Sequence, residues 1–181
     1  MPFKTLSQKI VWACPWYNVR QDEILLPDGR PGVYNVVQKE AAVWILPVTT
    51  EKQVVLIRSY RYTVDDWCWE IPAGSLKAGQ EPVEAARAEL AEEVGGQAQQ
   101  LEYLGQSYMA NGICDEVGHF FLATGVALGE TAHEAAEVIK VHLKPICKVL
   151  QMVRANEIHD APSALVILLC ADRLEAMIDK Q

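Results

Sequence analysis

The chain has 181 residues, of which 50% are hydrophobic and 22% are charged, and its formal net charge at pH 7 is −8. This composition excludes a disordered chain and predicts one domain with a proper core, with room for a small N-terminal extension. The negative charge argues against nucleic acid as the main partner, because no basic stripe is present to neutralise phosphates. A small phosphorylated ligand remains compatible, since a few arginines and a cation would bind it.

The cysteines and the apolar segments indicate the compartment. The five cysteines are odd in number and widely spaced, and no C-x-x-C pair occurs among them. They therefore predict reduced thiols in a cytoplasmic protein rather than a disulfide framework or a zinc site. The first residues lack the apolar region of a signal peptide, and no apolar run reaches the length of a membrane span. The expected partners accordingly include neither nucleic acid nor membrane.

In chain order, β-prone runs come first and helical spacing enters later. Strands are expected over residues 9–13, 16–26, 33–38, 41–48, 53–60, 67–71, 101–108, 117–123 and 138–143. A turn signal at residues 27–30 predicts that the strands on either side of it form a hairpin. Helices are expected over residues 83–94, 145–154 and 163–178, and residues 128–136 are the best candidate for a mobile loop. Helices inserted between groups of strands predict an α/β (α+β) sandwich around a mixed sheet.

The helix over residues 83–94 has clear start and stop signals. Pro82 stands at the expected first turn, where a missing N–H is tolerated, and Gly95 with Gly96 stops the helix. An apolar stripe is expected along one side of the helix, formed by Val83, Ala86, Leu90 and Val94.

The same helix carries three glutamates at helical spacing, Glu89, Glu92 and Glu93, which are expected to project to one side. Like charges placed in this way destabilise a helix unless they are compensated. A hard cation such as Mg²⁺ is one standard compensation, because carboxylate oxygens are its preferred ligands. The alternative interpretation is a solvated helix face, which is the usual meaning of a charge run.

Residues 74–96 resemble the Nudix box, the signature of the Nudix hydrolases. The box reads Gly, five residues, Glu, seven residues, Arg-Glu, an aliphatic, any residue, Glu-Glu, any residue, Gly and an aliphatic. The matching positions are Gly74, Glu89, Leu90, Glu92, Glu93 and Gly95, and the departures are Gln80, Ala88 and Gly96. In the family, the glutamate and arginine replaced by Gln80 and Ala88 form an ion pair that braces the loop against the helix. We hypothesise that Glu81 and Arg87, one step inward, form a substitute pair.

Further motifs resemble one branch of this family, the pyrophosphatases of ADP-ribose and nucleoside diphosphate sugars. Residues 60–62 and 70–74 are similar to the Q-Y-R and E-x-P-A-G elements of that branch. Residues 111–116 are similar to its S-P-G-x-x-D-E loop, with Asn111 where proline is usual, and residues 157–161 are similar to its C-terminal segment. The resemblance covers most of the chain. It implies a Nudix-like α/β/α sandwich with a mixed sheet over residues 41–181. It also implies an N-terminal antiparallel β extension over residues 1–40, which supports dimerisation and base contacts.

The resemblance implies Mg²⁺-dependent (or Mn²⁺-dependent) hydrolysis of the diphosphate in ADP-ribose or a related nucleoside diphosphate sugar. The products would be a nucleoside monophosphate and a sugar phosphate. The implied metal ligands are Glu89, Glu93, the Ala73 carbonyl and Glu92, and the last two glutamates of the box, Glu92 and Glu93, count as catalytic. A further carboxylate on the loop before the last strand would act as the base, with Glu137 the first candidate and Glu134 the second.

The implied substrate contacts are Arg61 and Arg58 for the phosphates, Glu70 for a base or ribose, and Asn111 in the loop. Arg61 suits the role of a clamp because its guanidinium is a bidentate fork. Arg58 is expected on the same strand face, with an edge-strand surface charge as the alternative. For Glu70 the alternative is an ordinary carboxylate at the end of a strand.

Trp16 and Tyr34 flank the N-terminal hairpin and would stack on the nucleobase, often from the partner subunit of a homodimer. Packing in the core or at a dimer interface is the alternative for each. Two other functions stay open: a non-catalytic Nudix domain that binds nucleotide sugars, for which Gln80 and Ala88 are the motivation, and a Nudix hydrolase of a different nucleoside diphosphate.

Overall fold

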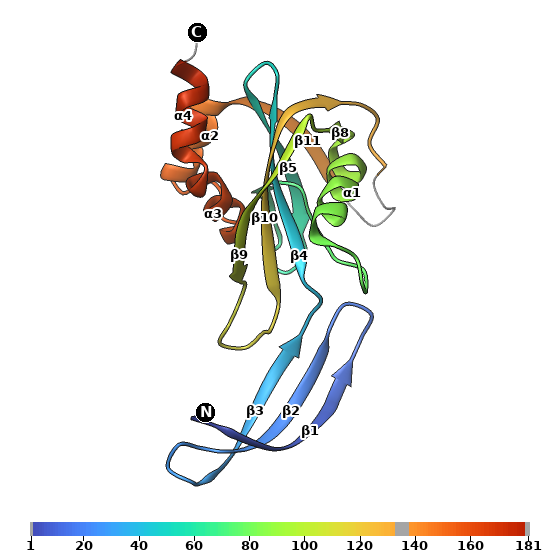
Figure 1. The fold of residues 1–181 in the computed structure, drawn as a ribbon, viewed down its shortest axis with the longest axis vertical. Coiled ribbons are helices and arrows are strands. Elements are labelled where there is room, and N and C mark those ends of the chain that lie inside the picture. The colour runs from blue at the N-terminus through green and yellow to red at the C-terminus, as the bar shows by residue number, and fades with distance from the viewer. Residues whose placement is uncertain (1, 133–137, 180–181) are drawn as a thin grey trace. The chain divides into compact units, whose positions relative to one another are not determined.

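The computed structural model describes residues 2–132 and 138–179 and is mixed α and β, as the sequence predicts (Figure 1). Its backbone contacts divide the chain into two compact units. The first unit contains residues 1–41 and 107–117, and the second contains residues 42–106 and 118–181. No helix among the described residues is long and apolar enough to cross a membrane.

The first unit is a three-stranded antiparallel sheet in the order β1-β2-β3. Its strands are β1 (Lys4–Ala13), β2 (Asn18–Leu25) and β3 (Pro31–Gln38). The predicted turn joins β2 and β3, and Gly29 supplies the left-handed conformation there with a φ of 84°. The strand expected over residues 9–13 starts earlier, at Lys4, because Lys4 pairs with Leu25 across the sheet. The hairpin expected over residues 16–38 is therefore part of a larger sheet.

The second unit contains one eight-stranded sheet, whose path runs β11-β5-β4-β10-β8, with β6 beside β5, β7 beside β4 and β9 beside β10. The strands are β4 (Ala42–Thr49), β5 (Gln53–Arg61), β6 (Asp66–Glu70), β7 (Ala73–Ser75), β8 (Gly96–Gln97), β9 (Gln100–Tyr108), β10 (Val117–Leu128) and β11 (Ile139–Pro145). The strands β7 and β8 are too short to give a periodic signal in the sequence. They exist because β4 and β10 offer them backbone partners.

Helices cover both faces of this sheet. Helix α1 (Pro82–Val94) packs against one face, where Ile45, Ile57, Leu90 and Phe121 share a buried cluster. Helices α2 (Ile146–Arg154) and α3 (Ala161–Leu169) contact β5 and β4 on the other side, and α4 (Ala171–Asp179) packs on both helices (Figure 1). Because both faces are covered, β4 and β5 are continuous apolar runs rather than alternating ones.

Two expectations for the helices need correction. Val83 does not join the buried stripe of α1: its side chain is 41% exposed, while Ala85 and Glu93 are buried. The single helix expected over residues 163–178 is two helices separated at Cys170, whose φ and ψ are −96° and 1°. The break allows α3 to contact β4 while α4 turns onto α2, which a straight helix could not do.

Candidate active site

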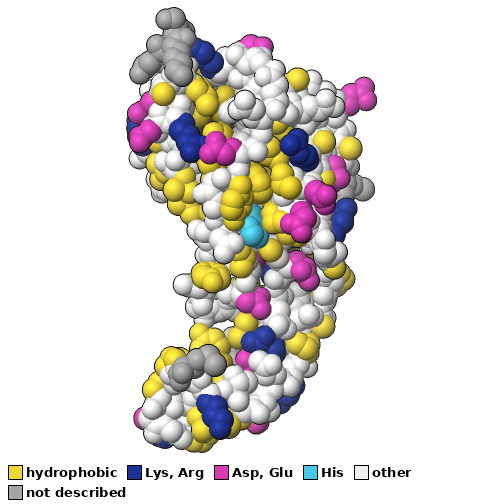
Figure 2. Space-filling view, viewed as in Figure 1, with side chains coloured by type: hydrophobic (Ala, Val, Ile, Leu, Met, Phe, Trp, Pro, Cys, Tyr) yellow, Lys and Arg dark blue, Asp and Glu magenta, His cyan; other side chains and the backbone are white. Residues whose placement is uncertain are grey.

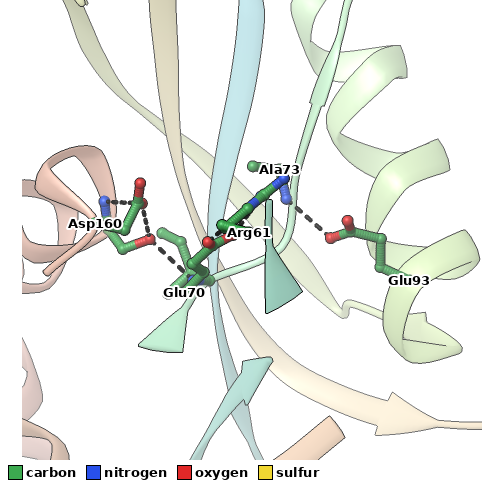
Figure 3. A network of polar contacts seen from close by, with 7 residues as sticks. Arg61, Glu70, Ala73, Glu93 and Asp160 are labelled. Carbon is green, nitrogen blue, oxygen red and sulfur yellow. Dashed lines mark hydrogen bonds and ion pairs between the residues drawn. The ribbon is translucent and has the colours of Figure 1, made fainter. Parts of the chain in front are cut away.

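Helix α1 presents two of its carboxylates to the loop that precedes it in the sequence. The Ala73 N–H donates a 3.0 Å hydrogen bond to Glu93 Oε2, and Glu93 is only 6% exposed (Figure 3). A Cβ added at Gly74 would lie 2.1–2.4 Å from the carboxylate atoms of Glu89. Glycine at position 74 thus leaves the space that the Glu89 carboxylate occupies. The four-residue spacing on the helix brings both carboxylates to the same short stretch of backbone.

The convergence of Glu89 and Glu93 fits a hard cation better than it fits a solvated helix face. One carboxylate is buried against backbone and the other fills a space that any side chain at Gly74 would close. Burial of a carboxylate such as that of Glu93 is costly unless a cation or donors compensate for it. Glu92 differs from both, because it is exposed on the helix surface. Within residues 2–132 and 138–179, no three His, Cys, Asp or Glu side chains form a metal-binding group by themselves. A metal here would therefore need backbone oxygen, substrate or water ligands as well.

Arg61 and Glu70 form a bidentate ion pair between β5 and β6. Arg61 Nε donates a 2.7 Å hydrogen bond to Glu70 Oε1, and Arg61 Nη2 donates to Glu70 Oε2 (Figure 3). The hydrogen bonds that Arg61 donates to Glu70 raise the pKa of Arg61 above its ordinary value, and the charges of Asp160 and Glu93 act in the same direction. Arg61 therefore stays fully charged among three carboxylates.

The Arg61–Glu70 pair lines a cavity of about 440 Å³. Two further residues of its wall, His159 and Asp160, immediately precede α3. The Arg61 side chain is 53% exposed and that of Glu70 is 5% exposed. The guanidinium thus lies at the cavity wall, and a buried carboxylate holds it in position.

Arg58 does not share a face with Arg61, contrary to the expectation from sequence. Successive residues of a strand point to opposite faces, so two residues three positions apart in β5 lie on opposite faces of the sheet. Arg58 instead lies over the ring of Trp69, with its guanidinium carbon 5.2 Å from the ring centroid. Lys144 lies over the same ring, at 4.6 Å.

The substitute ion pair proposed for the box is wrong, since no ion pair joins Glu81 and Arg87, and both side chains are exposed. Glu81 is the extended N-cap residue of α1, and a residue six positions further along a helix does not face it. Gln80 instead stabilises the turn over residues 77–80 through two hydrogen bonds with the backbone of Lys77. Its side-chain oxygen accepts from the Lys77 N–H at 3.0 Å, and its own N–H donates to the Lys77 carbonyl at 2.9 Å.

The candidate base-stacking residues belong to the first unit. Trp16 is 76% exposed and lines a cavity of about 300 Å³ together with Tyr17, Lys39 and Asp115. Tyr34 lies elsewhere in the unit and donates a 2.8 Å hydrogen bond to the Gly112 carbonyl, next to the exposed Asn111. The candidate bases Glu134 and Glu137 lie outside the described residues.

Asp160 is a residue of the candidate site that sequence reasoning did not single out. It is the N-cap of α3, where its carboxylate accepts from the Ser163 N–H at 3.0 Å. The signal was readable, because Asp followed by Pro at the second helical position is a common helix start. What the sequence did not show is that this cap lines the same cavity as Arg61.

Two family models and several curated proteins match this chain. Residues 38–165 match the family described as NUDIX domain, and residues 3–37 match the family described as nucleoside diphosphate sugar hydrolase N-terminal domain. The chain is 30% identical over 169 residues to an ADP-ribose pyrophosphatase of Bacillus subtilis, covering 91% of this chain and 90% of that protein. It is 32% identical over 160 residues to an ADP-ribose pyrophosphatase of Mycobacterium tuberculosis, covering 86% and 77% of the two chains.

The fold has a solved counterpart. A crystal structure titled as an ADP compounds hydrolase superposes with a TM-score of 0.84 at 20% sequence identity, over 98% of this chain and 96% of the other. At this identity the match establishes the shared fold of the two chains.

Proposed function

The chain belongs to the NUDIX family of hydrolases, and from this premise we propose that it hydrolyses the diphosphate of ADP-ribose or a related nucleoside diphosphate sugar. The products are a nucleoside monophosphate and a sugar phosphate. The observation that carries the proposal is the convergence of Glu89 and Glu93 on residues 73 and 74, in the unit that also holds the Arg61–Glu70 pair. The names of the two bacterial relatives support ADP-ribose, and the N-terminal family match supports the wider class of nucleoside diphosphate sugars.

One set of residues would bind the cation, and another set would bind the substrate. Glu89 and Glu93, with the Ala73 carbonyl, would hold Mg²⁺ or Mn²⁺. Glu92 would be a further ligand of the cation, reached from the exposed surface of the helix. When bound, the cation supplies charge neutralisation for the diphosphate and for the charge that develops on the attacked phosphorus. Arg61 binds a phosphate oxygen, and Glu70 orients Arg61 through its two hydrogen bonds. Glu137, or Glu134 in its place, takes the proton of the attacking water.

The N-terminal sheet serves substrate binding and assembly in this proposal. Trp16 and Tyr34 supply aromatic faces for a nucleobase, and Asn111 supplies a polar contact near Tyr34. A homodimer would cover the apolar side chains that this sheet leaves exposed. The five free cysteines are compatible with a cytoplasmic protein.

A substrate panel with product identification tests the proposal. The protein is incubated with ADP-ribose, ADP-glucose and GDP-mannose in the presence of Mg²⁺, and the nucleotide products are separated by chromatography. We expect release of AMP or GMP that requires the cation and is lost in Glu93→Gln. Tight binding of these compounds without any metal-dependent turnover would instead establish a non-catalytic nucleotide-sugar sensor, the alternative raised by Gln80 and Ala88.

A further inference from the structure

The segment over residues 71–74, which ends in the first two residues of β7, is held by three structural elements. The Pro72 carbonyl accepts from the Ile45 N–H of β4 at 2.9 Å. The Ala73 N–H donates to Glu93 of α1 at 3.0 Å. The Ile71 N–H, which is completely buried, donates to the hydroxyl of Ser163 in α3 at 3.0 Å. The loop that faces the two carboxylates of α1 is thus also fixed from the opposite side of the sheet.

Ser163 is suited to hold this loop because its hydroxyl group has a defined orientation. The side chain is fully buried, and its hydroxyl donates to Asp160 Oδ2 (Figure 3). With the proton directed to a carboxylate, the lone pairs of the oxygen are available to the Ile71 N–H. A donor bonded to an anion is also a stronger acceptor, since hydrogen bonds in a chain polarise one another.

The hydroxyl is not required for the helix cap. The cap consists of the Asp160 carboxylate accepting from the backbone N–H of Ser163, and alanine at position 163 would keep that bond. The hydroxyl adds its own bond to Asp160 and the link to Ile71, a residue 92 positions earlier in the chain. Its loss would leave a buried N–H without a partner, and the backbone that follows would shift to find one.

We propose that Ser163 is a positioning residue for the cation site, and that Asp160 acts through it. The chain Asp160–Ser163–Ile71 sets where residues 73 and 74 stand relative to Glu93 and Glu89, and so it sets the affinity for the divalent cation. The inference rests on the proposed function, because it assumes that these two glutamates hold the cation. It adds that α3, on the far face of the sheet, tunes the site.

Direct measurement of Mn²⁺ binding tests the inference without relying on turnover. Free Mn²⁺ is followed by electron paramagnetic resonance in titrations of the whole protein and its variants. We expect Ser163→Ala to bind Mn²⁺ about tenfold more weakly, the lower end of what outer-shell partners contribute. Asp160→Asn keeps an oxygen for the helix cap but removes the charge, and a smaller weakening in the same direction is expected.

Val166→Ala is the matched control, because Val166 is fully buried in the same helix and its side chain has no group that could donate or accept a hydrogen bond. It should lower the melting temperature and leave Mn²⁺ binding as in the wild type. Equal weakening by Val166→Ala would overturn the inference, since general loosening of α3 would then explain the effect. If Ser163→Ala fails to fold, Asp160→Asn decides, and wild-type Mn²⁺ binding in that variant overturns the inference.

Glu93→Gln separates this inference from the proposed function. If Glu93→Gln binds Mn²⁺ weakly and folded Ser163→Ala binds it as the wild type does, only the proposed role of Ser163 is rejected. If Glu93→Gln binds Mn²⁺ as tightly as the wild type, the proposed cation site is rejected, and the inference about Ser163 is rejected with it.

Discussion

The N-terminal sheet and the larger unit are built from similar strands but are stabilised in different ways. Among the described residues, thirty hydrophobic side chains are buried, and Ile24 is the one that belongs to the first unit. Every residue of β1 is exposed. Polar contacts take the place of a core there. Ser7 and Gln8 of β1 donate to Glu23 and Asp22 of β2 at 2.9 and 3.2 Å, and Arg20 forms a 2.8 Å ion pair with Asp22 within β2. Apolar side chains such as Leu6, Ile10 and Trp12 stay at the surface of this unit. Figure 2 shows hydrophobic side chains in yellow on the surface of the protein.

This difference indicates a division of roles. Catalytic groups must hold their geometry closely, and the larger unit provides a packed core on both sides of the sheet for that purpose. A sheet with exposed apolar side chains and little core is suited to contacts with a second chain or a ligand. Five changes would test this comparison, and they are given from the largest expected effect to the smallest.

Glu93→Gln should lower turnover of ADP-ribose by at least about 100-fold, because it removes a charge from the proposed cation site. The amide oxygen can still accept from Ala73, so the melting temperature should stay close to the wild-type value. Steady-state kinetics with varied Mg²⁺ measures the effect. Glu92→Gln is the neighbouring control, and its loss should be smaller because Glu92 is exposed. Equal losses for the two variants would contradict the assignment of Glu93 as the inward ligand.

Gly74→Ala should lower turnover about 100-fold while the fold remains intact. The added methyl group would meet the Glu89 carboxylate at 2.1–2.4 Å, and the flexible side chain would move away from the loop. Kinetics together with chemical denaturation separates activity from stability. Gly112→Ala in the first unit is the comparison for stability, because a Cβ there meets nothing within 4 Å. A Gly74→Ala protein with wild-type turnover would show that Glu89 is not needed next to the loop.

Arg61→Ala should reduce the free energy of unfolding by about 1–3 kcal/mol, because it leaves the buried Glu70 carboxylate without its partner. Partial exposure of Arg61 keeps the effect below that of a fully buried pair. The double variant Arg61→Ala/Glu70→Gln should recover part of the loss, as denaturation with urea would measure. If the double variant is no more stable than the single one, the ion pair is not what stabilises this wall of the cavity.

Ile10→Glu should change the free energy of unfolding of one chain by no more than about 0.5 kcal/mol, because Ile10 is 51% exposed. The same change should break the proposed homodimer, since it would place a charge among the apolar side chains that a second copy covers. Sedimentation velocity of Ile10→Glu against Ile10→Val measures the assembly. A dimer that persists in Ile10→Glu would show that this surface of the sheet is not the interface.

Acid should loosen the N-terminal sheet. Arg20 donates to Asp22 and holds the pKa of that carboxyl below its ordinary value. A lowered folded-state pKa gives stability that is present above the unfolded value of about 3.9 and is lost as the pH falls through the folded value. Amide chemical shifts of β1–β3 should therefore begin to change below about pH 4. Asp22→Asn should remove that pH dependence. A sheet whose shifts titrate identically in Asp22→Asn would contradict the role of this ion pair.

Local sequence patterns determined much of this protein. Proline and glycine explain the turn at residues 27–30, the start of α1 at Pro82 and its end at Gly95. The backbone preferences of these two residue types are local, so they act without contacts to distant parts of the chain. The spacing of Glu89 and Glu93 likewise predicts that both project from one side of α1. The order of the box and its flanking motifs then indicates the family, since several motifs at the right spacing are more specific than any one of them.

Only the tertiary structure decided which of those groups meet. It separated Arg58 from Arg61, turned Glu92 to the surface and left Glu81 and Arg87 unpaired with each other. It also placed Asp160 and Arg61 on the wall of one cavity. These outcomes depend on pairings between residues far apart in the chain, such as Ile71 with Ser163 and Arg61 with Glu70. A sequence read along its length records periodicity within each element. It does not record which elements pack together, because that depends on how the whole apolar surface is buried at once.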